Sequence, residues 1–196
     1  MKTLKKILVP VTLFIIGLFG AAQADVVLDN FNTNQSALTY KEAYHASDNT
    51  QLYDSVLFYS TRKILSYSGL LRKQSSYVII SNGRLYIDNT IDKNQKFAGR
   101  VTLEYNFNNE NFDNYSGIKI TTNGSLIKNA KVSASVDGPS EQSYAGLYAF
   151  NSVGEVILPF SNFKGAKLFN NINNLRIDFV NIKFWSGELL IELIEK

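Results

Sequence analysis

Apolar and polar residues alternate along most of the chain beyond residue 25, and this period of two predicts β-strands. One face of residues 100–107 carries the apolar side chains Val101, Leu103, Tyr105 and Phe107, and the other carries Thr102, Glu104 and Asn106. Residues 131–136 and 175–180 alternate in the same way. Further strands are predicted at residues 26–31, 55–60, 77–81, 84–88, 117–122, 143–150, 155–159 and 189–194.

Turn residues separate these runs. Asn82-Gly83 supplies the two positive φ angles of a type I′ turn and predicts a two-residue hairpin. Asn123-Gly124 and residues 137–139 mark two more turns, and residues 151–154 close another hairpin. Roughly ten to twelve short strands with such turns predict a single all-β domain, an antiparallel sandwich or barrel.

Few segments depart from this period. Residues 36–45 are interpreted as a short helix or an irregular strand, and residues 167–174 as a helical turn. The basic residues between Lys63 and Lys73 are spaced among Leu, Ser and Tyr, which is typical of a strand surface. Strands do not alternate with helices, which excludes a doubly wound nucleotide-binding fold.

The first residues have the three-part pattern of a secretory signal peptide. Three lysines lie within residues 1–6, residues 7–20 are apolar apart from Thr12, and Ala22-Gln23-Ala24 forms a small-residue cleavage site. The apolar run is shorter than the roughly 20 residues that span a bilayer. We therefore expect residues 1–24 to be removed. Residues 25–196 would then form one β-sandwich domain in the periplasm or the medium, without an integral membrane segment.

The charge balance and the residue counts exclude several functions. The chain holds 20 Lys and Arg against 17 Asp and Glu, and loss of Lys2, Lys5 and Lys6 leaves 17 of each. A neutral domain has no broad electrostatic attraction to nucleic acid. The sequence has no cysteine, which excludes disulfides, thiol nucleophiles and cysteine-bound metals. His45 is the one histidine and no G-x-S-x-G motif is present, so a serine-hydrolase triad is not expected.

Five segments in serial order resemble jelly-roll domains of the galactose-binding-like superfamily. These segments are Val26-Val-Leu-Asp-Asn-Phe31, Asp54-Ser-Val-Leu-Phe-Tyr-Ser-Thr-Arg62, Asn82-Gly-Arg-Leu-Tyr-Ile87, Phe112-Asp-Asn-Tyr-Ser-Gly-Ile118 and Leu158-Pro-Phe-Ser-Asn-Phe163. The last is similar to an element of carbohydrate-binding modules and complex I intermediate-associated proteins, and the second to secreted PEP-CTERM-associated proteins. The resemblance implies an antiparallel jelly-roll β-sandwich. Structural calcium is common in this superfamily, and Asp29, Asn30, Asn32 and Asn34 offer oxygen ligands near the first strand. No other cofactor is expected.

Sandwiches of this kind bind sugars by stacking aromatic rings beside polar groups. Trp185 is expected in a loop before the last strand, as a stacking platform or as a plug of the core. Tyr144 and Tyr148 share a parity in one predicted strand and are a second aromatic candidate. Arg62 is expected to pair with an acid or to contact the ligand.

The sequence favours a secreted, non-catalytic binding domain whose ligand is a glycan. One alternative is a structural protein of the envelope or matrix that binds other proteins. A second is a glycosidase with Glu104 and Asp178 as its two carboxylates, although both alternate with inward residues and would then point to solvent.

Overall fold

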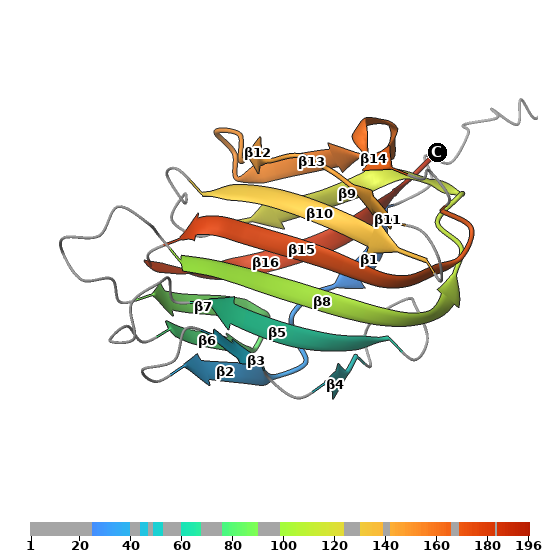
Figure 1. The fold of residues 1–196 in the computed structure, drawn as a ribbon. Helices are drawn as coiled ribbons and strands as arrows, with labels where there is room; N and C mark the ends of the chain where they lie inside the picture. The colour runs from blue at the N-terminus through green and yellow to red at the C-terminus, as the bar shows by residue number, and fades with distance from the viewer. Residues whose placement is uncertain are drawn as a thin grey trace, which may run out of the picture.

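The computed structural model describes residues 25–39, 44–46, 49–52, 60–67, 76–89, 99–123, 130–138, 142–165, 169–182 and 184–196. In this part of the chain the strands form two antiparallel sheets that stack face to face (Figure 1). A 3₁₀ turn, η1, spans Phe160–Asn162. The predicted all-β jelly-roll sandwich is confirmed.

The first sheet contains seven strands in the order β13-β9-β16-β7-β6-β2, with β1 also paired to β16. Their bounds are β1 Val26–Asp29, β2 Gln35–Thr39, β6 Ser76–Ser81, β7 Arg84–Asn89, β9 Tyr115–Thr122, β13 Glu155–Pro159 and β16 Phe184–Glu195. Strands β6 and β7 form the predicted hairpin. Ser81 pairs with Arg84, and Asn82 and Gly83 between them have φ angles of 50° and 74°.

The second sheet contains nine strands in the order β14-β11-β10-β15-β8-β5-β3, with β12 paired to β10 and β4 to β5. Their bounds are β3 Tyr44–Ala46, β4 Thr50–Gln51, β5 Thr61–Tyr67, β8 Gly99–Glu110, β10 Lys131–Asp137, β11 Gln142–Tyr144, β12 Tyr148–Ala149, β14 Lys164–Gly165 and β15 Ile172–Ile182. Lys63 lies in β5, as expected for a strand surface.

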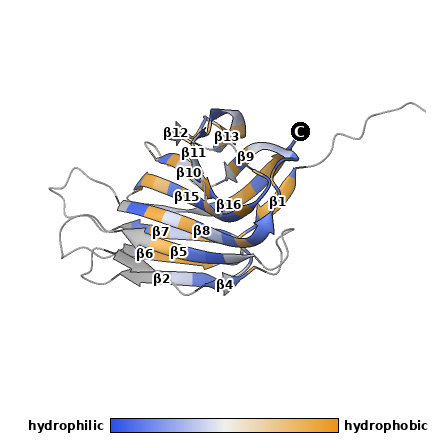
Figure 2. Ribbon diagram, turned by 45° about the vertical axis from the view of Figure 1, so that its right-hand side comes forward, coloured by the Kyte–Doolittle hydropathy of each residue, from blue (hydrophilic) through white to orange (hydrophobic). Residues whose placement is uncertain are grey.

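The inward faces of the two sheets form the hydrophobic core, because alternate side chains of each strand point to the same side. Figure 2 shows hydrophobic and hydrophilic residues alternating along several of these strands. Val101, Leu103 and Tyr105 of β8 are fully buried, as the alternation predicts. Leu103 pairs with Ile177 of β15 and with Ile64 of β5, which are also fully buried. The strands therefore present their remaining residues on the two outer faces.

Residues 35–39 and 44–46 are strands, because they pair with β6 and β5, and this confirms the strand alternative for that segment. Three other predictions of local structure need correction. Strand β15 already begins at Ile172, within the predicted helical turn. The predicted strand 143–150 is two strands, and Trp185 lies inside β16 rather than in a loop. The predicted strand 55–60 lies outside the described residues except for Ser60.

Candidate functional site

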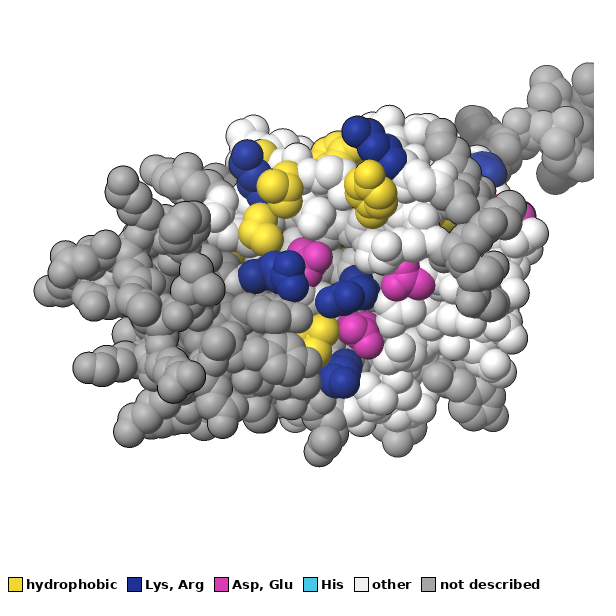
Figure 3. All heavy atoms as spheres, in the orientation of Figure 1, with side chains coloured by type: hydrophobic (Ala, Val, Ile, Leu, Met, Phe, Trp, Pro, Cys, Tyr) yellow, Lys and Arg dark blue, Asp and Glu magenta, His cyan; other side chains and the backbone are white. Residues whose placement is uncertain are grey.

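A row of polar side chains crosses the outer face of the nine-stranded sheet. The strand register places these residues opposite one another in the order Lys63, Glu104, Arg176, Ser135, Tyr144 and Lys164. A second row contains Thr102, Asp178 and Ser133. We call these two rows, together with Arg100, the ladder face. Figure 3 shows basic and acidic side chains alternating across the middle of this face, with hydrophobic side chains towards its upper edge.

Ion pairs hold the charged side chains of the ladder face in place. Arg176 Nε lies 3.6 Å from Glu104 Oε2, and Arg100 Nε lies 3.6 Å from Asp178 Oδ1. The Thr102 hydroxyl also donates a hydrogen bond to Asp178 Oδ1. These four charged side chains remain 22–41% exposed. They are therefore ordered donors and acceptors that a hydroxyl-rich ligand can still reach.

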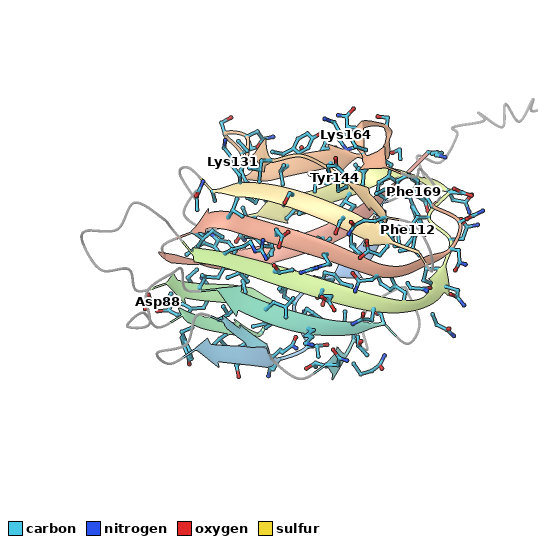
Figure 4. The ribbon with its side chains drawn as sticks, in the orientation of Figure 1. Asp88, Phe112, Lys131, Tyr144, Lys164 and Phe169 are labelled. Atoms are coloured by element: carbon cyan, nitrogen blue, oxygen red, sulfur yellow. The ribbon has the colours of Figure 1, made fainter. Side chains whose placement is uncertain are left out.

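Tyr144 provides an exposed aromatic ring on this face. It lies in β11 between Ser135 of β10 and Lys164 of β14, and it is 50% exposed. Its neighbour Ser143 points inward and is buried. Figure 4 shows Tyr144 and Lys164 together at the upper edge of the sheet. The predicted ligand residue Tyr144 thus lies beside the ion-paired rows.

Tyr148 does not share the orientation of Tyr144. Tyr144 pairs with Ser135, but Tyr148 pairs with Val132, so one extra residue lies between the two tyrosines on their side of the ladder. Such a β-bulge reverses the parity of every later residue. Tyr148 accordingly packs against the core and accepts a hydrogen bond from Asn162 Nδ2 at 3.1 Å. Alternation in the sequence could not reveal the bulge.

Trp185 lies in the core and is 1% exposed. Its place in β16, opposite Ile87 of β7, directs the indole between the sheets. This matches the interpretation of Trp185 as a core plug and leaves no indole face for a sugar to stack on. Of the predicted aromatic candidates, Tyr144 alone is on the ladder face.

Arg62 is buried and pairs with Asp29 at 2.6 Å. Its Nε also donates to Gln35 Oε1 at 2.8 Å. The expectation that Arg62 pairs with an acid is confirmed, and its side chain has no exposed surface for a ligand. Asp29 Oδ2 further accepts from the Tyr105 hydroxyl at 2.8 Å, and Asp29 Oδ1 accepts from the backbone N–H of Phe31 at 2.8 Å. Burial, followed by the Asp29 carboxylate, raises the pKa of Tyr105 well above its usual value.

The expected calcium ligands do not converge. Asp29 points into the core, where both of its oxygens accept hydrogen bonds from protein groups. Asn30 and Asn32 instead line a cleft of about 450 Å³ on the outer side of the seven-stranded sheet. The described residues contain no group of three or more His, Cys, Asp or Glu side chains placed to hold a metal ion. Asp29 is thus directed away from the cleft that Asn30 and Asn32 line.

A second pocket, of about 610 Å³, lies where β9, β13 and β16 meet η1. Its floor consists of the nearly buried rings of Phe112, Phe160 and Phe169, and Phe160 stacks on Phe169 at 4.5 Å. Figure 4 shows Phe112 and Phe169 close together at one end of the sandwich. Tyr115 also lines this pocket, and burial together with Glu195 and Glu110 raises its pKa.

Glu104 and Asp178 both face outward, as the alternation predicts, and each is paired with an arginine. His45 is the middle residue of strand β3. In the described residues no helix is long and apolar enough for a membrane crossing.

Sequence reasoning missed Arg176, Arg100 and Ser135. Their outward parity was readable, but their positions opposite Glu104, Asp178 and Tyr144 depend on strand register.

No protein-family model matches this chain, and a search of curated proteins found no significant match. Similar solved structures include the family 11 carbohydrate-binding module of the cellulosomal cellulase Lic26A-Cel5E of Clostridium thermocellum. It is 14% identical with a TM-score of 0.46, over 90% of this chain and 97% of that chain. A family 11 module of the same organism, in complex with a β-1,3-1,4-mixed-linked tetrasaccharide, is 15% identical with a TM-score of 0.45. That match covers 87% of this chain and 95% of that chain.

Proposed function

We propose that the protein is an exported, non-catalytic glycan-binding domain and that the ladder face is its binding surface. One observation carries the proposal: a half-exposed tyrosine lies in the same row as an Arg176–Glu104 ion pair on one sheet face. A sugar presents an apolar C–H face to an aromatic ring and its hydroxyls to charged donors and acceptors. Tyr144 supplies the ring, and Arg176 and Glu104 supply the polar groups.

The length of the row favours an extended glycan. From Lys63 to Tyr144 the row crosses the strands β5, β8, β15, β10 and β11. Neighbouring strands lie about 4.8 Å apart, so the row spans roughly 19 Å. Ser135 lies opposite Arg176 and Ser133 lies opposite Asp178. Their small side chains leave room for a chain of sugar rings across the strands.

The ion pairs of the ladder face support glycan binding rather than cleavage of a glycosidic bond. Glu104 and Asp178 each lie in an ion pair, which fixes them as acceptors for sugar hydroxyls. The export part of the proposal rests on the three-part signal-peptide pattern of residues 1–24.

The experiment uses the exported protein, which should begin at Asp25 by mass spectrometry. Binding to soluble mixed-linked β-glucan, xylan, mannan and galactan is measured by calorimetry for the wild type and for Tyr144→Ala. Loss of one stacked ring is worth about 0.5–1.5 kcal/mol beyond its buried area, so we expect an affinity loss of about tenfold.

Ile157→Ala is the matched control, because Ile157 is similarly exposed at 42% but lies on the other sheet. This variant should bind like the wild type. No new reducing ends should appear in any sample. The proposal would be contradicted if the wild type bound none of the four polysaccharides, or if Tyr144→Ala bound them with the same affinity as the wild type. A stable oligomer or a co-purifying protein would point to the protein-binding alternative.

A further inference from the structure

A polar cleft lies on the outer side of the seven-stranded sheet, facing away from the ladder face. Its polar lining consists of Asn30, Asn32, Asn82, Thr121, Asn123 and Glu188, and we call it the asparagine cleft. It has a volume of about 450 Å³, which is within the range of small-ligand sites. Its wall on β16 includes Leu190, which points outward because Leu189 and Ile191 are buried.

Two segments distant in the sequence form one side of the cleft. The Asn82-Gly83 turn contacts the loop after β1, where Gly83 N–H donates to the Phe31 carbonyl at 3.1 Å. A Cβ on Gly83 would lie 3.3 Å from Asn32 Oδ1, so the turn packs closely against the Asn32 amide. The opposite side is also ordered. Asn123 Nδ2 donates to the Glu188 carboxylate, and Glu188 N–H donates to Asn123 Oδ1.

Several polar groups in the asparagine cleft are available to a ligand. The side-chain amides of Asn32 and Asn82 and the hydroxyl of Thr121 make no hydrogen bond to the described residues, although they line one cleft. An amide offers both donors and an acceptor, which suits neighbouring hydroxyls of a sugar ring. Leu190 offers an apolar surface for the C–H face. Among the described residues of the lining, Glu188 is the one charged group, which disfavours acidic ligands.

We propose that the asparagine cleft is a second binding site, for neutral glycans, so that one molecule joins two polysaccharide chains. The inference rests on the proposed function of the ladder face. The two sites lie on opposite outer faces of the sandwich, so one glycan chain bound to the ladder face does not block the cleft. A two-site protein binds a polymer with avidity, and each site contributes to it.

The first test is a nuclear magnetic resonance titration with oligosaccharides of the β-glucan, xylan, mannan and galactan used above. The side-chain amide signals of Asn32 and Asn82 should shift at saturating sugar. If these two amide signals do not shift with any of the sugars, the inference is overturned. Shifts with calcium chloride alone, and none with the sugars, would overturn it in favour of a cation site.

The second test compares variants in a polysaccharide cross-linking assay that follows solution viscosity. The cleft variant is Asn32→Ala with Asn82→Gly, because glycine keeps the positive φ of the turn. Its matched control is Asn109→Gly, an exposed asparagine with a φ of 58° outside the cleft lining. The wild type and the control should cross-link. The cleft variant should still bind but not cross-link, and its affinity for the polymer should fall at least about tenfold.

The outcomes separate this inference from the proposed function. If Tyr144→Ala loses all binding and the cleft variant cross-links like the wild type, the ladder face stands and the second site is overturned. If the cleft variant loses all binding and Tyr144→Ala behaves like the wild type, the ladder face fails, and the cross-linking inference is overturned with it.

Discussion

At the scale of single residues, the most constrained position is Arg62. Its guanidinium lies fully inside a β-sandwich, where it bonds Asp29 and Gln35, donates to the Thr33 carbonyl at 2.5 Å, and lies 5.2 Å from the Phe31 ring. Phe31 has a φ of 61°, which is unfavourable for a residue with a side chain. Arg62 therefore fixes the irregular path of the chain after β1, because its guanidinium binds polar groups of that segment.

Arg62→Met is expected to lower the free energy of unfolding by about 3–5 kcal/mol, because the Asp29 carboxylate is left buried without its ion-pair partner. Urea unfolding followed by circular dichroism measures the loss. The double variant Arg62→Met with Asp29→Leu should lose less than Arg62→Met alone, since it removes the unpaired charge. An unchanged urea midpoint for Arg62→Met would show that the buried pair contributes no such stability. Arg100→Met, at a half-exposed ion pair, is the control and should cost about 1 kcal/mol or less.

At the scale of elements, short turns and bulges decide where each strand places its side chains. Gly154 closes the turn before β13 with a φ of 83°. Its N–H donates to the Asn151 carbonyl, and its carbonyl accepts from Thr122 N–H of β9 at 2.9 Å. The turn is thereby held against the end of the neighbouring strand. The bulge between β11 and β12 acts in the same way on Tyr144 and Tyr148, which it turns to opposite sides.

Gly154→Ala is expected to lower the free energy of unfolding by about 1–3 kcal/mol. The added Cβ would lie 2.4 Å from the Thr122 carbonyl oxygen, and the positive φ is also unfavourable for alanine. Thermal and urea unfolding measure the change. Gly146→Ala is the matched control, because a Cβ there meets nothing within 4 Å. Equal stability of the two variants would refute the close approach of the Gly154 turn to Thr122 of β9.

At the scale of the whole molecule, two groups link global stability to alkaline pH. The pKa of Tyr105 is raised well above its usual value, first by burial and then by the Asp29 carboxylate. The pKa of Lys119 is raised by its hydrogen bonds to Asp25 and Glu192. Both groups keep their protons longer in the folded state. Their contributions are fully present below the usual pKa values and are lost as the pH rises through the raised ones.

The free energy of unfolding should therefore fall as the pH rises from neutral to strongly alkaline values, because the unfolded chain releases these protons first. Urea titrations at a series of pH values measure the slope. Tyr105→Phe should be less stable at neutral pH, since Asp29 loses a donor, but its stability should fall less steeply with pH. A slope identical to that of the wild type would exclude Tyr105 as a source of the dependence.

The alternation of apolar and polar side chains in the sequence predicted most of the fold. Each strand must bury one face, so Val101, Leu103 and Tyr105 had to point inward wherever β8 lay. Asn82-Gly83 determined its hairpin for a similarly local reason, the positive φ angles. An acidic partner for Arg62 was also expected, and the structure identifies it as Asp29.

Tertiary structure alone decided which residues meet. The register of β8, β15, β10 and β11 brought Glu104, Arg176 and Tyr144 into one row, although they are far apart in the chain. One inserted residue turned Tyr148 inward, and pairing with β7 drew Trp185 into the core. Alternation determines the side to which a residue points, because it depends on the strand alone. The neighbours of that residue depend on pairing between distant segments, which no local pattern contains.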